Sequence, residues 1–175
     1  MELGLTWPLQ RQLHCFPSPG EEENRLFCWD AHCIRLRGES CLLLVHCASR
    51  YSCLRFALSP LDWARLPELM EEELRLSLAE AGLREEDVER YLSAAGPLRL
   101  SRTHGRREVA FLNRAWEDVL AAEPLLEEGS QRQPLLNCAL NELFCRCAGE
   151  AGLDRPSARL RRMLSEQKLG KAHPE

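Results

Sequence analysis

The most constraining feature of this chain is a continuous apolar run over residues 41–45, which leads into His46. Five apolar residues in succession leave no polar face, so the run favours a β-strand that is buried on both sides. Residues 26–36 and 51–58 alternate between apolar and polar side chains more nearly with a period of two. Short polar turns separate the three segments, which therefore predict an antiparallel meander.

Helical patterns follow this meander. Ser59 or Asp62 can cap a long helix in which apolar residues recur at helical intervals as far as residue 82. The remaining predictions are a helix over residues 83–95, a strand over 98–103, a helix around 109–119, two helices over 133–151 and 155–167, and a basic tail over 168–175.

These elements predict an α+β fold. We expect a small, mainly antiparallel sheet of about four strands packed against helices, with a helical extension at the C-terminus. Residues 1–128 are assigned to the α+β domain, and residues 129–175 to the helical extension with its polar tail. A length of 175 residues with 45% hydrophobic and 29% charged residues suits a chain that buries a core of this size.

Charge and composition restrict the classes of partner. The net charge of −4 gives no general attraction to nucleic acid, so nucleic-acid binding is possible only through a local basic patch and is not favoured. No export signal and no apolar segment of membrane-spanning length is apparent. Nine cysteines, an odd number, then favour reduced thiols and a cytoplasmic location. The abundance of Arg, Leu and Ala suggests a bacterial source, and the oligomeric state is left open.

Cysteine and histidine gather in one region, which invites interpretation as a metal site. The candidates are Cys28, His32, Cys33, His46 and Cys47. They lack the paired CxxC spacing of structural zinc sites, and neighbours on a strand point to opposite faces. We therefore expect no metal and no cofactor, with the thiols serving as small apolar core residues.

Two other clusters favour packing or solvation over chemistry. Cys145 and Cys147 fall in a predicted helix, where residues two apart point in different directions. The acidic run at residues 71–73 fits a solvated helix face beside a buried apolar stripe, and Arg55 is expected to face water.

The densest group of polar side chains lies at the last predicted strand-to-helix junction. Arg102, Thr103, His104, Arg106 and Arg107 stand close together there. A helix N-terminus attracts anions and arginines can add bidentate contacts, so the junction is a candidate anion- or partner-binding site. The alternative is that these arginines are solvated or paired with the many glutamates. No GxGxxG, Walker-type or GxSxG motif occurs in the chain.

Several short motifs resemble an uncharacterised bacterial family, a domain of unknown function. They are a T-x-x-L element at Thr6 and Leu9, a strand containing Trp29, a hairpin over residues 42–58, and a segment containing Thr103, Arg107 and Asn113. His46 and Ser49 stand where that family has Asn and Thr, and Ala110 and Phe111 where it has small residues. The resemblance covers about residues 1–120 and implies an α+β fold and a bacterial source, but no substrate.

Three functional hypotheses remain. The first is a cytoplasmic binding or regulatory module whose junction arginines and C-terminal helices contact a protein or an anionic partner. The second is an enzyme acting on a phosphate-bearing or nucleic-acid substrate, with Arg102 and Arg107 stabilising charge. In that enzyme His104 would transfer protons and Asn113 would orient the substrate. The third is purely structural and requires Arg107 and Asn113 to be buried hydrogen-bonding props. No residue is assigned a catalytic role, and the binding module is preferred to the enzyme.

Overall fold

The computed structural model describes residues 1–147 and 151–166. Its α-helices are α1 (Trp7–Leu13), α2 (Pro60–Ala64), α3 (Leu66–Glu80), α4 (Glu85–Ala95), α5 (Arg106–Ala121), α6 (Pro134–Glu142) and α7 (Pro156–Glu166). Its strands are β1 (Glu2–Leu5), β2 (Cys28–Leu36), β3 (Glu39–His46), β4 (Ser52–Arg55), β5 (Arg99–Arg102), β6 (Cys145–Arg146) and β7 (Leu153–Asp154). The predicted tail over residues 168–175 lies outside the described part of the chain.

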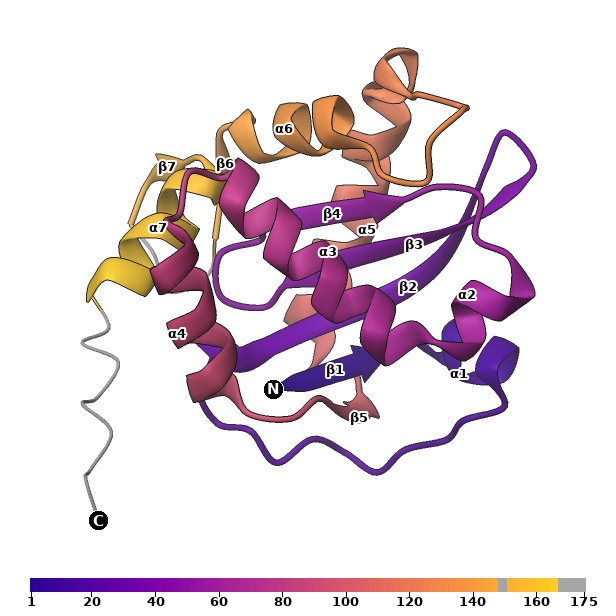
Figure 1. Ribbon diagram of the computed structural model, residues 1–175, viewed down its shortest axis with the longest axis horizontal. Coiled ribbons are helices and arrows are strands. Elements are labelled where there is room, and N and C mark those ends of the chain that lie inside the picture. Colours follow the sequence, from indigo (N-terminus) through magenta and orange to yellow (C-terminus); the bar gives the residue numbers. More distant parts are fainter. Residues whose placement is uncertain (148–150, 167–175) are drawn as a thin grey trace.

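The central sheet has five strands in the order β4-β3-β2-β1-β5 (Figure 1). The β2–β3 and β3–β4 pairs form the predicted antiparallel meander, whereas β1 pairs in parallel with both β2 and β5. The α+β class is therefore confirmed, but the sheet is mixed and has one strand more than expected. The additional strand, β1, is four residues long and contains Glu2 and Gly4. Strands disfavour both residue types, so only the alternation of Met1, Leu3 and Leu5 with them marks this strand in the sequence.

Helices cover the sheet on both faces. In Figure 1, α3 and α4 lie in front of the sheet and α5 lies behind it. On the α3 face, Trp29 and Leu44 pack in one core with Met70, and on the α5 face Leu43 packs in a second core with Phe111. The apolar run of β3 is thus divided between two cores, as predicted for a strand buried on both sides.

The predicted long helix is two helices. Ser59 begins α2 with a capping box, in which its side chain accepts from the amide of Asp62 and the Asp62 carboxylate accepts from the amide of Ser59. α2 ends at Ala64, and after Arg65 the chain begins α3 with Pro67 in its first turn. Proline has no amide hydrogen to donate into a continuous helix, so it marks a helix start.

A buried ion pair joins α3 to β4, and the sequence interpretation of both partners was wrong. Arg55 Nε donates to Glu73 Oε2 at 2.5 Å, and the two side chains are 4% and 0% exposed. Ser77 Oγ also donates to the Glu73 carboxylate, at 2.6 Å. Glu71 and Glu72 remain exposed as expected. A buried carboxylate needs such partners because burial removes its water shell.

α6 completes the open edge of β4 with side chains in place of another strand. Asn137 Oδ1 accepts from the Leu54 amide at 2.8 Å, and Asn141 Oδ1 accepts from the Ser52 amide at 2.8 Å. Both asparagines are buried. α6 therefore has a specific place against the sheet, because it satisfies backbone groups that would otherwise lack partners.

The helix predicted over residues 133–151 ends early, at Glu142, and β6 follows it. The reason is a tertiary contact: the guanidinium of Arg159, fully buried on α7, donates to the Cys145 carbonyl at 2.5 Å. Residues 148–150 of that predicted helix lie outside the described residues. Within the described residues, no helix combines the length and the apolar character needed to span a bilayer.

The turn between β3 and β4 depends on a buried histidine. His46 Nε2 donates to the Leu26 carbonyl at 2.9 Å, so Nδ1 is the acceptor for the amide and the hydroxyl of Ser49 at 3.2 and 2.7 Å. The Leu26 carbonyl also accepts from Tyr91 Oη at 2.9 Å. Burial lowers the pKa of His46 from 6.5 to about 4, which favours the neutral ring that this pattern requires.

We predict that His46 makes the protein sensitive to acid. Between pH 6.5 and 4 the unfolded chain binds a proton at residue 46 that the folded chain does not, so the free energy of unfolding falls as pH falls. At about 1.4 kcal/mol per pKa unit the loss amounts to roughly 3 kcal/mol. His46→Asn should be less stable than the parent chain at neutral pH but should lose about 3 kcal/mol less on acidification, as measured by urea unfolding.

The matched control is His14→Asn, because His14 is exposed and has a left-handed backbone conformation that Asn accepts. This variant should follow the pH dependence of the parent chain. If His46→Asn and the parent chain lose the same stability on acidification, His46 is not the source of the acid sensitivity.

Candidate functional site

The junction between β5 and α5 buries one of its predicted site residues and exposes others. The side chain of His104 is 2% exposed and turns inward beneath the sheet. It meets a group that we call the His104 cluster. Its members are Glu2, Cys28, Asp30, Cys47 and His104. Their donor atoms form two overlapping groups, Glu2–Cys28–His104 and Asp30–Cys47–His104, and within each group all of these atoms lie within 4.8 Å of one another.

The imidazole of His104 lies between two carboxylates. Its Nδ1 is 2.6 Å from Asp30 Oδ1, a hydrogen-bond distance, and its Nε2 is 3.4 Å from Glu2 Oε2. The sulfur of Cys47 lies 3.6 Å from Nδ1. The carboxylates come from the adjacent strands β1 and β2, on the α5 face of the sheet. The cluster is therefore a polar core that replaces the apolar packing found under the rest of α5.

Burial and hydrogen bonding determine the protonation of the cluster. Burial lowers the pKa of His104, but the hydrogen bond to Asp30 and the neighbouring thiols outweigh it and raise the pKa well above 6.5. Burial also raises the pKa of Asp30, and His104 opposes that shift. One proton therefore stays between ring and carboxylate above neutral pH. Burial raises the pKa of Cys47 to about 12, so this cysteine remains a thiol and is not an activated nucleophile.

Two glycines make room for the cluster. A Cβ atom on Gly4 would lie 2.0 Å from Asp30 Oδ1 and 2.9 Å from His104 Nδ1. A Cβ atom on Gly20 would lie 2.2 Å from Glu2 Oε2. The cluster therefore fits only because β1 and the loop before β2 lack side chains at these two points.

The junction arginines do not gather around His104. Arg102 and Arg106 are exposed, and Arg102 Nε donates to the Pro17 carbonyl at 3.2 Å. Arg107 donates two hydrogen bonds to the Glu108 carboxylate, at 3.0 and 2.6 Å. Glu108 is buried in the first turn of α5. The helix N-terminus thus already has an acidic residue in the place that its dipole favours.

Two further predicted residues lie apart from the cluster's centre. Thr103 is half-buried beside β1, with its Cα 2.9 Å from the Cβ position of Gly4. Asn113 is exposed on α5, seven residues beyond Arg106 and so about 10 Å along the helix axis. Arg107 is also exposed, so Arg107 and Asn113 are not the buried props that the structural hypothesis required.

The cysteines and histidines that gather in the sequence between residues 28 and 47 do not all lie together in the fold. His46 holds the β3–β4 turn, and His32 Nδ1 lies 2.8 Å from Thr6 Oγ1. Cys33 packs against the apolar core on the α3 face. Only Cys28 and Cys47 of that group reach the cluster. All nine cysteines carry free thiols in the structure.

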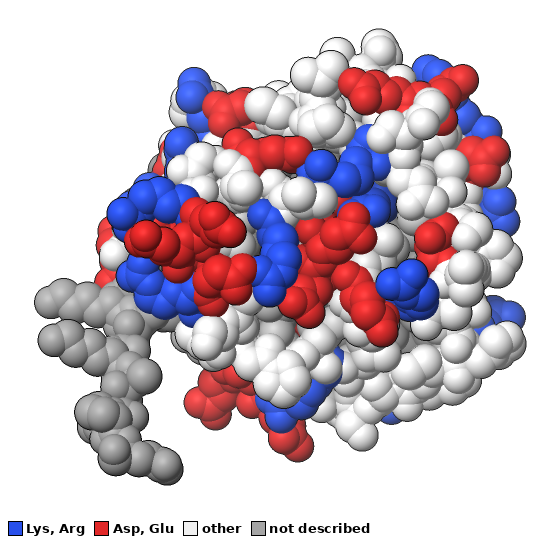
Figure 2. Space-filling model, viewed as in Figure 1, with Lys and Arg blue, Asp and Glu red and all other residues white. Residues whose placement is uncertain are grey.

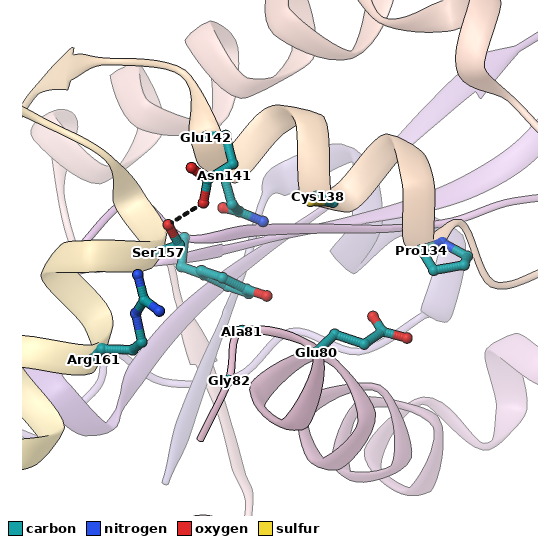
Figure 3. Close-up of a pocket in the computed structure, with 10 residues that line it drawn as sticks. Glu80, Ala81, Gly82, Pro134, Cys138, Asn141, Glu142, Ser157 and Arg161 are labelled. Carbon is teal, nitrogen blue, oxygen red and sulfur yellow. Dashed lines mark hydrogen bonds between the residues drawn. The ribbon is translucent and has the colours of Figure 1, made fainter. Parts of the chain in front are cut away.

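A separate hollow lies between the end of α3, α6 and α7 (Figure 3). Its volume is about 180 Å³, below the ~300–1,000 Å³ of typical ligand pockets. Its polar groups are used in the fold: Ser157 Oγ donates to Glu142 Oε1 at 2.6 Å, and Asn141 holds β4. No predicted site residue is among the described residues that line it, so the His104 cluster is the candidate site.

Comparison with known proteins places the chain in a family. A family model described as a domain of unknown function (DUF6933) matches residues 2–158. The chain belongs to this family. The match includes α6 and the start of α7, so the family extends well beyond the residues 1–120 that carry the sequence resemblance. No curated protein matches the chain.

Most of the cluster in this DUF6933 protein could not be identified from sequence. His104 stands out in the sequence because it lies among the junction arginines. Asp30 lies 74 residues before it and Glu2 lies 102 residues before it, so nothing in the local sequence connects them. The sequence predicts Cys28 and Cys47 to be core residues rather than members of a site. The available signal was a strand-like segment, residues 1–5, that carries an acidic residue and a glycine where apolar residues are usual.

We predict that Gly4→Ala destabilises the fold by disrupting the cluster. The new methyl group would overlap Asp30 Oδ1, and overpacking of this kind costs about 1–3 kcal/mol or more. Urea unfolding should measure this loss. Gly129→Ala is the control, because a Cβ atom there meets nothing within 4 Å. If both variants unfold at the same urea concentration, the Asp30 carboxylate does not lie as close to Gly4 as the structure places it.

Proposed function

We propose that this chain is a cytoplasmic bacterial binding or regulatory module that contacts an acidic protein partner. The contact surface is defined by Trp7, Arg11, Phe16 and Arg102, and we call it the aromatic–basic surface. The exposed Trp7–Phe16 ring pair beside Arg102 is the observation that carries the proposal. Nine free thiols, five of them buried, support a reducing compartment.

Two exposed aromatic rings form the centre of this surface. Trp7 is 62% and Phe16 is 60% exposed, and their ring centroids are 5.6 Å apart. Large aromatic side chains gain free energy on burial, and they are enriched among the residues that dominate protein interfaces. An exposed pair of this kind supports docking of a partner.

Arginines border the aromatic pair. Arg102 donates to the carbonyl of Pro17, the residue next to Phe16, and Arg102 is paired with Leu5 in the sheet, two residues before Trp7. Arg11 and Phe16 line the same shallow hollow. Exposed arginines beside aromatic rings favour carboxylate groups on a partner, which they can bind in a bidentate manner.

The face formed by α3 and α4 lacks this character. Figure 2 shows positive and negative side chains interspersed over α3 and α4. There Arg75 pairs with Glu71 at 3.0 Å and with Glu89, and Arg84 pairs with Asp87 at 2.9 Å. Paired charges of mixed sign attract neither polyanions nor polycations strongly. Together with the net charge of −4, this disfavours nucleic acid as the partner.

We predict that Arg102→Ala combined with Arg11→Ala weakens partner binding. Both residues are exposed, so their loss removes positive charge from the surface without leaving a buried group unpaired. Tagged full-length chains would be purified from a bacterial cytoplasm and their bound proteins quantified by mass spectrometry. At about 1.4 kcal/mol per tenfold, the loss of two charge contacts should reduce recovery of a specific acidic partner roughly tenfold.

The control is Arg84→Ala with Arg90→Ala, which removes two exposed arginines, one just before α4 and one within it, that both pair with Asp87. This variant should retain the partner, whereas Trp7→Ala should lose it. Equal recovery of the partner with the parent chain, the double-arginine variant and the Trp7 variant would overturn the proposal.

A further inference from the structure

We infer that the His104 cluster is a zinc site in which Glu2, Cys28 and His104 are the ligands and Asp30 orients the histidine. The three ligands come from β1, the start of β2, and the turn before α5. Their donor atoms lie within 4.8 Å of one another. A thiolate, an imidazole and a carboxylate form a donor set that suits Zn²⁺ and excludes Ca²⁺ and Mg²⁺, which prefer oxygen ligands alone.

Asp30 determines which nitrogen of His104 is available. The 2.6 Å contact between Asp30 Oδ1 and Nδ1 places the ring hydrogen on Nδ1. The lone pair of Nε2 then points away from Asp30 and toward Glu2. This carboxylate–histidine arrangement is the usual outer-shell support of a zinc-bound imidazole.

The space between His104 and Glu2 has the dimension that an ion requires. His104 Nε2 and Glu2 Oε2 are 3.4 Å apart, and their side chains are 2% and 4% exposed. Neither atom makes a hydrogen bond within the described residues. Two ligands about 2.1 Å from a tetrahedral ion lie roughly 3.4 Å from each other. One ion would therefore give both buried atoms a partner.

Neighbouring groups support the other ligand atoms. Glu2 Oε1 accepts from the Glu21 amide at 2.9 Å, which leaves Oε2 directed at the histidine. Arg25 Nη1 lies 3.8 Å from Cys28 Sγ. The positive charge of this guanidinium lies beside the sulfur that we assign to the metal.

The second group of donor atoms, Asp30–Cys47–His104, is a weaker candidate. Its histidine nitrogen, Nδ1, is already used by the hydrogen bond to Asp30, and 2.6 Å is too short for two ligands of one ion. We therefore assign Cys28, and not Cys47, to the metal. The two cysteines make a matched pair for an experiment, because both approach His104 and both are buried.

The test measures metal bound to the full chain. Protein purified without chelators would be analysed for zinc by native mass spectrometry, and the metal-free chain would be titrated with Co²⁺, whose thiolate charge-transfer absorption reports a Cys ligand. We expect one ion per chain and a cobalt–thiolate band. Cys28→Ser should lose the band and should weaken zinc binding by more than the roughly 10- to 100-fold that loss of an outer-shell partner causes. Cys47→Ser should keep the band.

Circular dichroism of each metal-free variant separates loss of the site from loss of the fold. Absence of both zinc and the cobalt–thiolate band in a folded parent chain would overturn the proposal, leaving His104 as an imidazolium between Asp30 and Glu2. A band that survives Cys28→Ser but disappears in Cys47→Ser would overturn the ligand assignment. Neither result depends on the aromatic–basic surface, because both are measured without a protein partner.

Discussion

The hydrogen bond between Asp30 and His104 connects parts of the chain that are 74 residues apart. It runs from β2 to the turn after β5 and crosses β1 between them, at Gly4. Because β1 is only four residues long and is paired in parallel on both sides, this crossing fixes its place in the sheet. Glu2 then points at the same imidazole. The polar half of the α5 face is therefore organised by one buried histidine.

The other half of that face follows ordinary apolar packing. Along α5, Phe111 and Val119 join the core over β3 and β4, whereas Glu108 lies near the polar cluster. The change from polar to apolar occurs within one helix. The same junction directs His104 inward and leaves Arg102 exposed, because β5 ends at Arg102 and the hydrogen bond to Asp30 holds His104 beneath the sheet. A buried site and an exposed surface are thereby built on one short segment.

Local patterns predicted most of the elements, whereas the long-range contacts escaped them. The apolar run of β3 and the helical stripes depend on neighbours in sequence, so residues 41–45 and the helix after Ser59 were recognisable. β1 was missed because Glu2 and Gly4 are explained only by His104. Arg55 and Glu73 were misplaced because each is buried only through the other. The early end of α6 depends on Arg159, which lies on another helix. Site residues that satisfy one another across the fold leave no periodic signal.

The state of the five histidine rings tests this account most directly. Long-range ¹H–¹⁵N correlation spectra of the full chain should show His104 with a hydrogen on Nδ1 and a pKa well above 6.5, because Asp30 holds that hydrogen against the opposing effect of burial. His46 should be a neutral ring with its hydrogen on Nε2 alone. A His104 ring that titrates near the ordinary value of about 6.5 would contradict the central hydrogen bond.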